Sequence, residues 1–327
     1  MALTRSIRSS RNSVPALFAA PLALALGGLL SACGGAGGTG TAEAIEPDQV
    51  VRTTAYPVHF LTERVAGPEI EVELVLPAGA DPIFWQPPRE VLAALQGSRL
   101  IVTNGADFER WMRSASLPST RVVRSADGFA DRHLQFEGAT HSHGPTGEHS
   151  HTGTDGHTWM DPRNAEDQAL AIAAALADAY PDQAEQIQGR MVALRADLRA
   201  LDRRLTQMLP ALAQVRLIAS HPAYDYIAAR YGLEIVNLDL DPAEPLGLAD
   251  FASIEAATDA GRVNVLLWES EPLAETVTEL DERLGVRSVV FSPAEGPPAA
   301  GEPDYLGVMN ANLDRLGEAA GVTSEGE

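Results

Sequence analysis

Residues 181–209 read PDQAEQIQGRMVALRADLRALDRRLTQML, and the spacing of their apolar residues indicates how the fold is organised. Apolar positions follow one another at alternating steps of four and three: Ile187, Met191, Leu194, Leu198, Leu201, Leu205 and Met208. This spacing predicts one apolar stripe along an α-helix about 40 Å long, at about 1.5 Å per residue. A coiled coil would need a longer run, so we expect one rigid helix packed across two parts of the protein.

Strand-like runs alternate with helical segments on both sides of this helix. Before it, strands are expected at residues 50–55, 69–76 and 100–104. After it, strands are expected at residues 215–220, 234–238, 263–268 and 286–291. Such alternation predicts parallel sheets covered by helices. We therefore expect an α/β fold of two parallel-sheet lobes, residues 48–180 and 210–327, joined by the long helix at 181–209.

The N-terminus has the pattern of an export signal. Three arginines precede an apolar run at residues 15–30, which is shorter than the roughly 20 residues of a membrane span and predicts a signal peptide. Its end, LSAC at residues 30–33, resembles the lipobox of bacterial lipoproteins, and Cys33 is the only cysteine. The resemblance implies a signal peptide at residues 1–32 and a lipid on Cys33. The Gly-, Ala-, Thr- and acid-rich residues that follow predict a flexible tether at 33–47. We expect an extracytoplasmic protein that is lipid-anchored to a bacterial membrane, in the periplasm or at the cell surface.

The chain is strongly acidic. It carries 45 Asp and Glu against 24 basic residues, all of them Arg, for a net charge of −21. Such a charge repels nucleic acid and anionic membrane surfaces and attracts cations. We expect no nucleic-acid partner. We also expect no enzyme, because the sequence has no Ser or Cys nucleophile motif, no His-Glu-x-x-His pair and no acid pair for a two-metal site.

Five of the eight histidines lie within HSHGPTGEHSHTGTDGH at residues 141–157. The surrounding stretch, 134–156, is rich in Gly, His, Ser and Thr and has no hydrophobic period, which predicts a long loop. A His-rich tract is typical of metal binding. We therefore expect an accessory metal loop that uses His141, His143, His149 and His151, and a merely solvated loop is the alternative.

Four other side chains are candidate metal ligands because of their places beside the expected strands and helices of the two parallel sheets. His59 follows the first expected strand, and His157 directly precedes a helix. His221 and Glu269 each stand at the end of a strand in the second lobe. Ligands of open parallel sheets bind beyond the carboxyl ends of the strands, and imidazoles with a carboxylate suit zinc.

Two motifs resemble those of a known family. GHTWMDPRNA at residues 156–165 is similar to the His-x-Trp-Leu-Asp-Pro-x-Asn-Ala motif of the solute-binding lipoproteins of zinc and manganese ABC importers. SHPAYDYIAARYGL at residues 220–233 is similar to that family's His-x-Ala-Phe-x-Tyr-x-x-x-x-Tyr-Gly-Leu. The resemblance implies that His157 and His221 bind the metal, and that Glu269 matches the family's strand-end acid. Because the family's carboxylate ligand is sometimes a residue shortly after that acid, Glu271 is the rival of Glu269. It also implies capture of a divalent metal and its delivery to an ABC permease.

One segment departs from that family. The family's Pro-x-Gly-x-x-Pro-His-x-Tyr-Glu-Pro reads PAGADPIFWQP at residues 77–87, so Ile83 replaces a ligand His and Gln86 replaces the Glu. Isoleucine cannot bind a metal. Three outcomes are open: His59 fills the vacancy, a loop histidine does so, or the site is weakened or repurposed. We expect His59 to fill it.

The remaining expectations concern the metal, other residues and other functions. Three imidazoles with one carboxylate favour Zn²⁺, whereas Mn²⁺ prefers more oxygen ligands. His133 is expected to be an ordinary surface residue, and Asp239 and Asp241 to belong to a solvated loop. We expect a monomer. The alternative functions are a zinc-storing or zinc-chaperone lipoprotein without a transporter, and a metal-dependent hydrolase.

Overall fold

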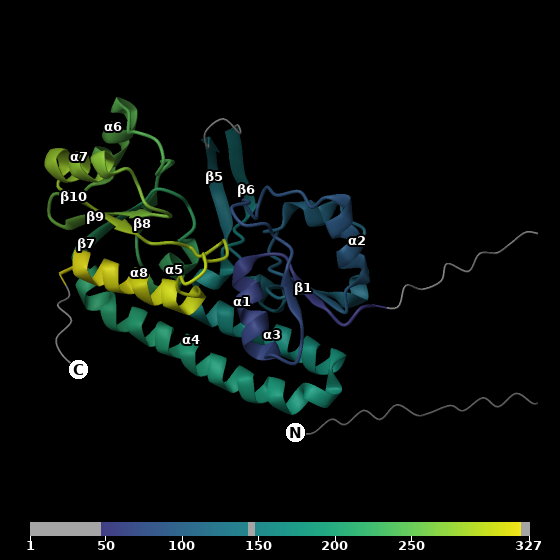
Figure 1. Cartoon of the computed structure of the whole chain (residues 1–327). Coiled ribbons are helices and arrows are strands. Elements are labelled where there is room, and N and C mark those ends of the chain that lie inside the picture. The colour runs from purple at the N-terminus through teal and green to yellow at the C-terminus, as the bar shows by residue number, and fades with distance from the viewer. Residues whose placement is uncertain (1–46, 143–147, 322–327) are drawn as a thin grey trace, which may run out of the picture. The chain divides into compact units, whose positions relative to one another are not determined.

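The computed structural model of the chain describes residues 47–142 and 148–321 (Figure 1). The expected signal peptide, Cys33, the tether up to residue 46 and His143 lie outside the described residues. Within the described ranges, no helix combines the length and the apolar character that crossing a bilayer requires.

The N-terminal sheet has four parallel strands in the order β2-β1-β3-β4. These strands are β1 (Val51–Thr53), β2 (Val72–Leu74), β3 (Leu100–Thr103) and β4 (Val122–Arg124). The helices of this part are α1 (Tyr56–Ala66), α2 (Arg89–Gly97) and α3 (Pro162–Ala179). Every residue of β1 and β3 is buried, as expected of central parallel strands that are covered on both faces.

The C-terminal sheet is also parallel, in the order β10-β9-β7-β8. Its strands are β7 (Val215–Ala219), β8 (Ile235–Asn237), β9 (Val263–Trp268) and β10 (Val286–Val290). Its helices are α5 (Asp225–Tyr231), α6 (Leu248–Ala257), α7 (Ala274–Leu284) and α8 (Tyr305–Ala319). The predicted α/β class with two parallel sheets is confirmed.

The long helix is α4 (Ala184–Leu212), and it joins the two sheets (Figure 1). It packs against α1 and α3 of the N-terminal part and against α8 of the C-terminal part. The predicted apolar stripe is buried from Ile187 to Leu205, whereas Met208 is half-buried. The helix runs three residues past its predicted end, because Pro210 lies in the last turn and removes only one backbone hydrogen bond.

The His-rich stretch forms a third, separate sheet rather than a loop. Strands β5 (Gln135–Ser142) and β6 (Glu148–Thr154) pair antiparallel, with His141 opposite His149. The prediction of an irregular loop over 134–156 is therefore wrong for these strands. The stretch has no alternation of apolar and polar residues, so only the pairing of its backbone defines the hairpin.

Short 3-10 helices complete the described chain. They are η1 (Arg110–Arg113), η2 (Ser119–Arg121), η3 (Asp127–Arg132), η5 (Thr158–Met160) and η6 (Pro181–Gln183). Of these, η5 connects His157 to the start of α3.

Candidate metal site

His157 stands on a short segment that the start of α3 holds in place. Asp161 caps α3, accepting a hydrogen bond from the backbone N of Arg163 at 2.9 Å, and Pro162 takes the first helical position. Three aromatic rings surround the imidazole: Phe108, Phe136 and Trp159. His157 is only 1% exposed, so its ring nitrogens must find partners inside the protein.

Both ring nitrogens of His157 meet carboxylates. Nδ1 lies 2.7 Å from Oδ1 of Asp155, and Nε2 lies 2.8 Å from Oε1 of Glu295. Burial alone would lower the pKa of His157, but the charges and hydrogen bonds of Asp155 and Glu295 outweigh it and raise the pKa to about 10. A carboxylate on Nδ1 is also the arrangement that orients metal-binding imidazoles.

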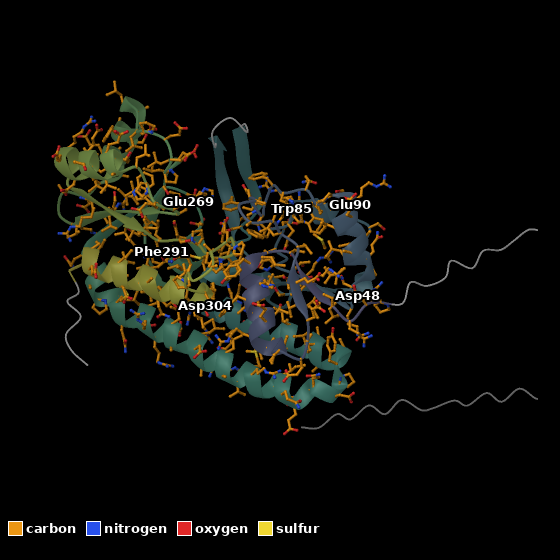
Figure 2. All side chains as sticks on the ribbon, viewed as in Figure 1. Asp48, Trp85, Glu90, Glu269, Phe291 and Asp304 are labelled. Atoms are coloured by element: carbon orange, nitrogen blue, oxygen red, sulfur yellow. The ribbon has the colours of Figure 1, made fainter. Side chains whose placement is uncertain are left out.

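His221 and Glu269 reach the same place from the second sheet. His221 follows β7 and Glu269 follows β9, at the carboxyl ends of adjacent strands. Nδ1 of His221 lies 3.9 Å from Oε2 of Glu269. The His221 ring lies 6.1 Å from the His157 ring, nearly perpendicular to it. Figure 2 shows Glu269 on the side of the second sheet that faces the first.

Glu269 is electrostatically coupled to its neighbours. Burial raises its pKa, and the nearby Glu295 raises it further, to about 7, while His157 acts in the opposite direction. Two imidazoles and two carboxylates therefore converge from both lobes. Within the described residues, however, no three His, Cys, Asp or Glu side chains are close enough together to hold a metal ion as they stand.

A cavity of about 470 Å³ opens beside these side chains. His221, Glu269 and Glu295 line it, and Ile83 and Asp81 lie on its wall. Ile83 also borders a smaller cavity that reaches His157. The position at which the sequence departs from the resembled family thus lies at this site. Glu271 is exposed and does not line the cavity, so the structure brings Glu269 to the group rather than its rival.

His59 is not brought to this group. It lies one turn into α1, where Nδ1 is 3.0 Å from Oγ1 of Thr53 and Nε2 is 3.4 Å from Oε2 of Glu63. Its side chain lines a different cavity, together with Phe60 and Asp304. The expectation that His59 replaces the missing ligand is therefore corrected. In α1 this side chain contacts the end of β1 and Glu63, and the cavity that it lines is not the one lined by His221 and Glu269.

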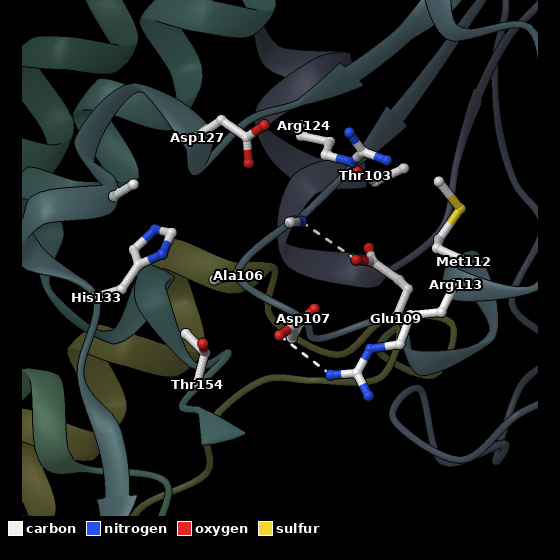
Figure 3. A pocket seen from close by; sticks show the side chains of 12 residues that line it. Thr103, Ala106, Asp107, Glu109, Met112, Arg113, Arg124, Asp127, His133 and Thr154 are labelled. Carbon is white, nitrogen blue, oxygen red and sulfur yellow. Dashed lines mark hydrogen bonds and ion pairs between the residues drawn. The ribbon is translucent and has the colours of Figure 1, made fainter.

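His133 also lies elsewhere. It is half-buried, with Nε2 3.0 Å from the carbonyl oxygen of Ala126 and its ring against Phe129. It lines another cavity of about 520 Å³ in the N-terminal lobe, which Figure 3 shows with Glu109, Arg113 and Asp127 on its walls. The accessory histidines His141, His149 and His151 fall on β5 and β6.

Sequence reasoning missed Glu295 and Asp155. Glu295 comes five residues after the end of β10, in the segment SPAEG at residues 292–296. Glu269 directly follows its strand, whereas Glu295 lies further along the connecting segment, so a search for carboxylates just beyond strand ends does not find it. Asp155 stands two residues before His157, inside the stretch 134–156 for which the sequence predicts a loop.

Comparisons with known proteins agree with this architecture. The family model described as zinc-uptake complex component A, periplasmic, matches residues 51–319. The zinc-binding lipoprotein AdcA of Streptococcus pneumoniae is 28% identical over 274 residues, which cover 81% of this chain and 54% of AdcA. This chain thus spans about half the length of that relative. The high-affinity zinc uptake system protein ZnuA of Bacillus subtilis is 26% identical over 314 residues, 90% of this chain and 95% of that protein.

A solved structure shows the same fold. The metal-dependent lipoprotein YcdH from Bacillus subtilis superposes with a TM-score of 0.71 at 24% identity, covering 83% of this chain and 98% of that one. The family model spans both lobes and the long helix between them. The chain therefore belongs to the ZnuA family, the zinc-uptake complex component A proteins.

Proposed function

We propose that this protein captures a divalent metal ion, zinc in preference to manganese, outside the cytoplasmic membrane and delivers it to an ABC permease. The observation that carries the proposal is the cavity lined by His221, Glu269 and Glu295 of the second lobe, with His157 of the first lobe held 2.8 Å from Glu295. The zinc-related names of the relatives support the choice of metal.

The metal is held by Nε2 of His157, the imidazole of His221 and the carboxylates of Glu269 and Glu295. Four ligands of nitrogen and oxygen match the number and kind that zinc takes in proteins. To bind, Nε2 of His157 exchanges its hydrogen bond with Glu295 for the metal, and a proton leaves the ring. The pair between Nδ1 and Asp155 remains and keeps the ring oriented.

The expected lipid on Cys33 keeps the protein at the membrane, where the permease is. The protein acts as a monomer, and its two lobes present the metal to the transporter. The histidines of the hairpin collect zinc at lower affinity and pass it to the cavity. A zinc store without a transporter would use the same hairpin, and a permease and an ATPase encoded next to this chain would favour import.

Metal analysis and competition titration of the purified chain test the proposal. We expect one tightly bound zinc per chain. His157→Ala and His221→Ala should each weaken zinc affinity by more than about 100-fold, since losing only a group that orients a ligand costs about 10- to 100-fold. His133→Ala is the control and should bind as the wild type does. Wild-type affinity in both ligand variants would overturn the proposed site.

A further inference from the structure

Asn104 is a fully buried amide beside the segment that carries His157. It directly follows β3 and is 0% exposed. Its Nδ2 donates to the carbonyl oxygen of Gly156 at 2.9 Å. Its Oδ1 accepts from Oγ1 of Thr158 at 3.2 Å. One side chain therefore holds both chain neighbours of His157.

Asn104 is itself fixed by groups that do not touch the metal site. Nε2 of Gln168 donates to its Oδ1 at 2.8 Å and to Oγ of Ser125 at 2.9 Å. The backbone N of Asn104 donates to Oε1 of Glu109 at 2.7 Å, and Oγ1 of Thr54 donates to the same oxygen at 2.5 Å. The backbone N of Gly105 donates to Oε2 of the same carboxylate, and Figure 3 draws this bond as a dashed line to Glu109. The amide thus has one orientation, with every polar atom paired.

The segment held by Asn104 has little room to settle in another position. A side-chain carbon at Gly156 would lie 2.7 Å from Cδ2 of Phe108, closer than carbon atoms approach one another. The Phe108 ring also packs edge-on against Trp159, with centroids 4.8 Å apart, and against His157, at 5.9 Å. Hydrogen bonds on one side and a ring on the other therefore define where the His157 imidazole stands.

We propose that Asn104 is a positioning residue of the metal site, whose carboxamide fixes the backbone on both sides of His157 and so places Nε2 of His157 opposite Glu295. The inference rests on the proposed function, in which His157 binds the metal. Coordination tolerates displacements of only about 0.5 Å, so a backbone free to shift by more weakens binding while the ligand itself is intact. Supporting groups of this kind affect metal affinity by about 10- to 100-fold.

Two substitutions distinguish the hydrogen bond that Asn104 donates to Gly156 from the one that it accepts from Thr158. Asn104→Ala removes both the donor to Gly156 and the acceptor for Thr158. Asn104→Asp keeps the shape and the acceptor but sets an oxygen against the Gly156 carbonyl, which repels it. Both variants should bind zinc about 10- to 100-fold more weakly than the wild type in a competition titration.

Asn264 provides a matched control in the other lobe. It is 8% exposed, and its carboxamide braces a turn: Oδ1 accepts from the backbone N of Asp259 at 2.8 Å, and Nδ2 donates to the carbonyl oxygen of Asp259 at 3.1 Å. Asn264→Ala removes a comparable pair of hydrogen bonds far from His157 in sequence. It should lower the free energy of unfolding and leave zinc affinity unchanged.

The decisive experiment measures zinc affinity, the visible spectrum with Co²⁺ in place of zinc, and the free energy of unfolding of the full chain. The Co²⁺ bands report the geometry of the ligands. We expect altered bands and weakened zinc binding in Asn104→Asp and Asn104→Ala, and wild-type bands in Asn264→Ala. If Asn104→Ala does not fold, Asn104→Asp carries the test.

The failure of this inference can be told from a failure of the proposed function. His157→Ala is titrated in the same series. If His157→Ala loses affinity while the folded Asn104 variants keep wild-type affinity and spectra, the positioning role is overturned and the proposed site stands. If Asn264→Ala weakens binding as much as Asn104→Ala, the effect is one of general stability and the inference is also overturned. If His157→Ala itself binds normally, the proposed function fails.

Discussion

Nε2 of His157 lies 2.8 Å from Oε1 of Glu295, so one hydrogen bond joins the two lobes at the cavity. Two further bonds act beside it: Nε1 of Trp159 donates to the carbonyl oxygen of Pro293 at 2.8 Å, and the Tyr305 hydroxyl donates to the carbonyl oxygen of Trp159 at 2.7 Å. These three hydrogen bonds between the lobes therefore fix the distance between the candidate ligands His157 and Glu295.

Glu295→Gln tests the contribution of the second-lobe carboxylate. The amide keeps the size of the side chain but loses the charge that a metal cation attracts, so zinc affinity should fall by about tenfold or more. Competition titration measures the change. Glu302→Gln removes an exposed carboxylate from the same connecting segment and should have no effect. Equal affinity in Glu295→Gln and the wild type would remove Glu295 from the ligand set.

Ile83→His tests the position at which the sequence departs from its family. Ile83 lines the cavity with His221 and Glu269 and also borders the space beside His157. An imidazole there adds a nitrogen ligand to a set of two imidazoles and two carboxylates. Because nitrogen ligands favour zinc over manganese, the variant should bind zinc more tightly and manganese relatively less. Competition between the two metals measures this, and an unchanged ratio would mean that residue 83 does not reach the metal.

The parts of the fold predicted from sequence are those with a local periodic signal. The stripe in α4 repeats over 22 residues, from Ile187 to Met208, so local spacing alone defines the helix. Strand β4 is defined by its pairing with β3, and the hairpin, which has no apolar alternation, is defined only by the pairing of its two strands with each other.

In the candidate site, too, the residues with a local sequence signal are the ones that could be predicted. His157 and His221 lie in extended local motifs, and both reach the site. Glu295 meets His157 across 138 residues of sequence, a distance that only the folded chain closes. The structure places His59 elsewhere, because proximity to a strand end in sequence does not fix where a side chain lies: on α1 it lines another cavity.

His59 should make the fold sensitive to acid. Burial lowers the pKa of His59 below its usual 6.5, and Glu63 on the same helix only partly offsets this. Arg64 and Asp304 face the same cavity. Because the folded-state pKa is depressed, the unfolded chain takes up the proton first as the pH falls, so stability is lost as the pH falls below about 6.5.

His59→Asn removes this proton uptake and keeps a polar atom near Oγ1 of Thr53. Urea unfolding of both proteins at pH 8 and pH 5 measures the effect. The wild type should lose more unfolding free energy between the two pH values than the variant does. Equal losses would show that His59 titrates alike in the folded and unfolded chain.

Leu198→Ala tests whether the apolar stripe of α4 is the buried face that stabilises the fold. Leu198 is fully buried in the main core, so the lost contacts and the cavity left behind should cost about 2–5 kcal/mol of unfolding free energy. Val192, on the same helix, is 65% exposed, and Val192→Ala should change it by less than about 0.5 kcal/mol. Chemical denaturation measures both. Similar losses in the two variants would contradict the assignment of the buried face.

The last prediction concerns the His-rich hairpin. His141, His149 and His151 fall on β5 and β6, and in the pairing register they lie on the turn side of Phe136, whose ring lies 6.4 Å from the His157 ring. With His143 they are the four histidines of residues 141–151 in the sequence. Fixing a polar hairpin around one ion costs backbone entropy, so these histidines should bind zinc more weakly than the cavity does. Their attachment to the chain still keeps the collected metal at a high effective concentration near the cavity. Imidazoles must be neutral to bind, so collection should fade below about pH 6.5.

Deleting residues 141–151 leaves Phe136 and Thr154 in place. The deletion variant should keep one tight zinc site, lose the weaker additional sites, and load more slowly when free zinc is scarce. Calorimetry on the variant beside the intact chain counts the sites, and stopped-flow competition at low zinc measures loading. A variant in which those four histidines are replaced by Ser, with the chain length unchanged, separates the loss of imidazoles from the loss of the hairpin. If both variants lost the tight site, a hairpin histidine would be one of its ligands, and the set of His157, His221, Glu269 and Glu295 would be incomplete.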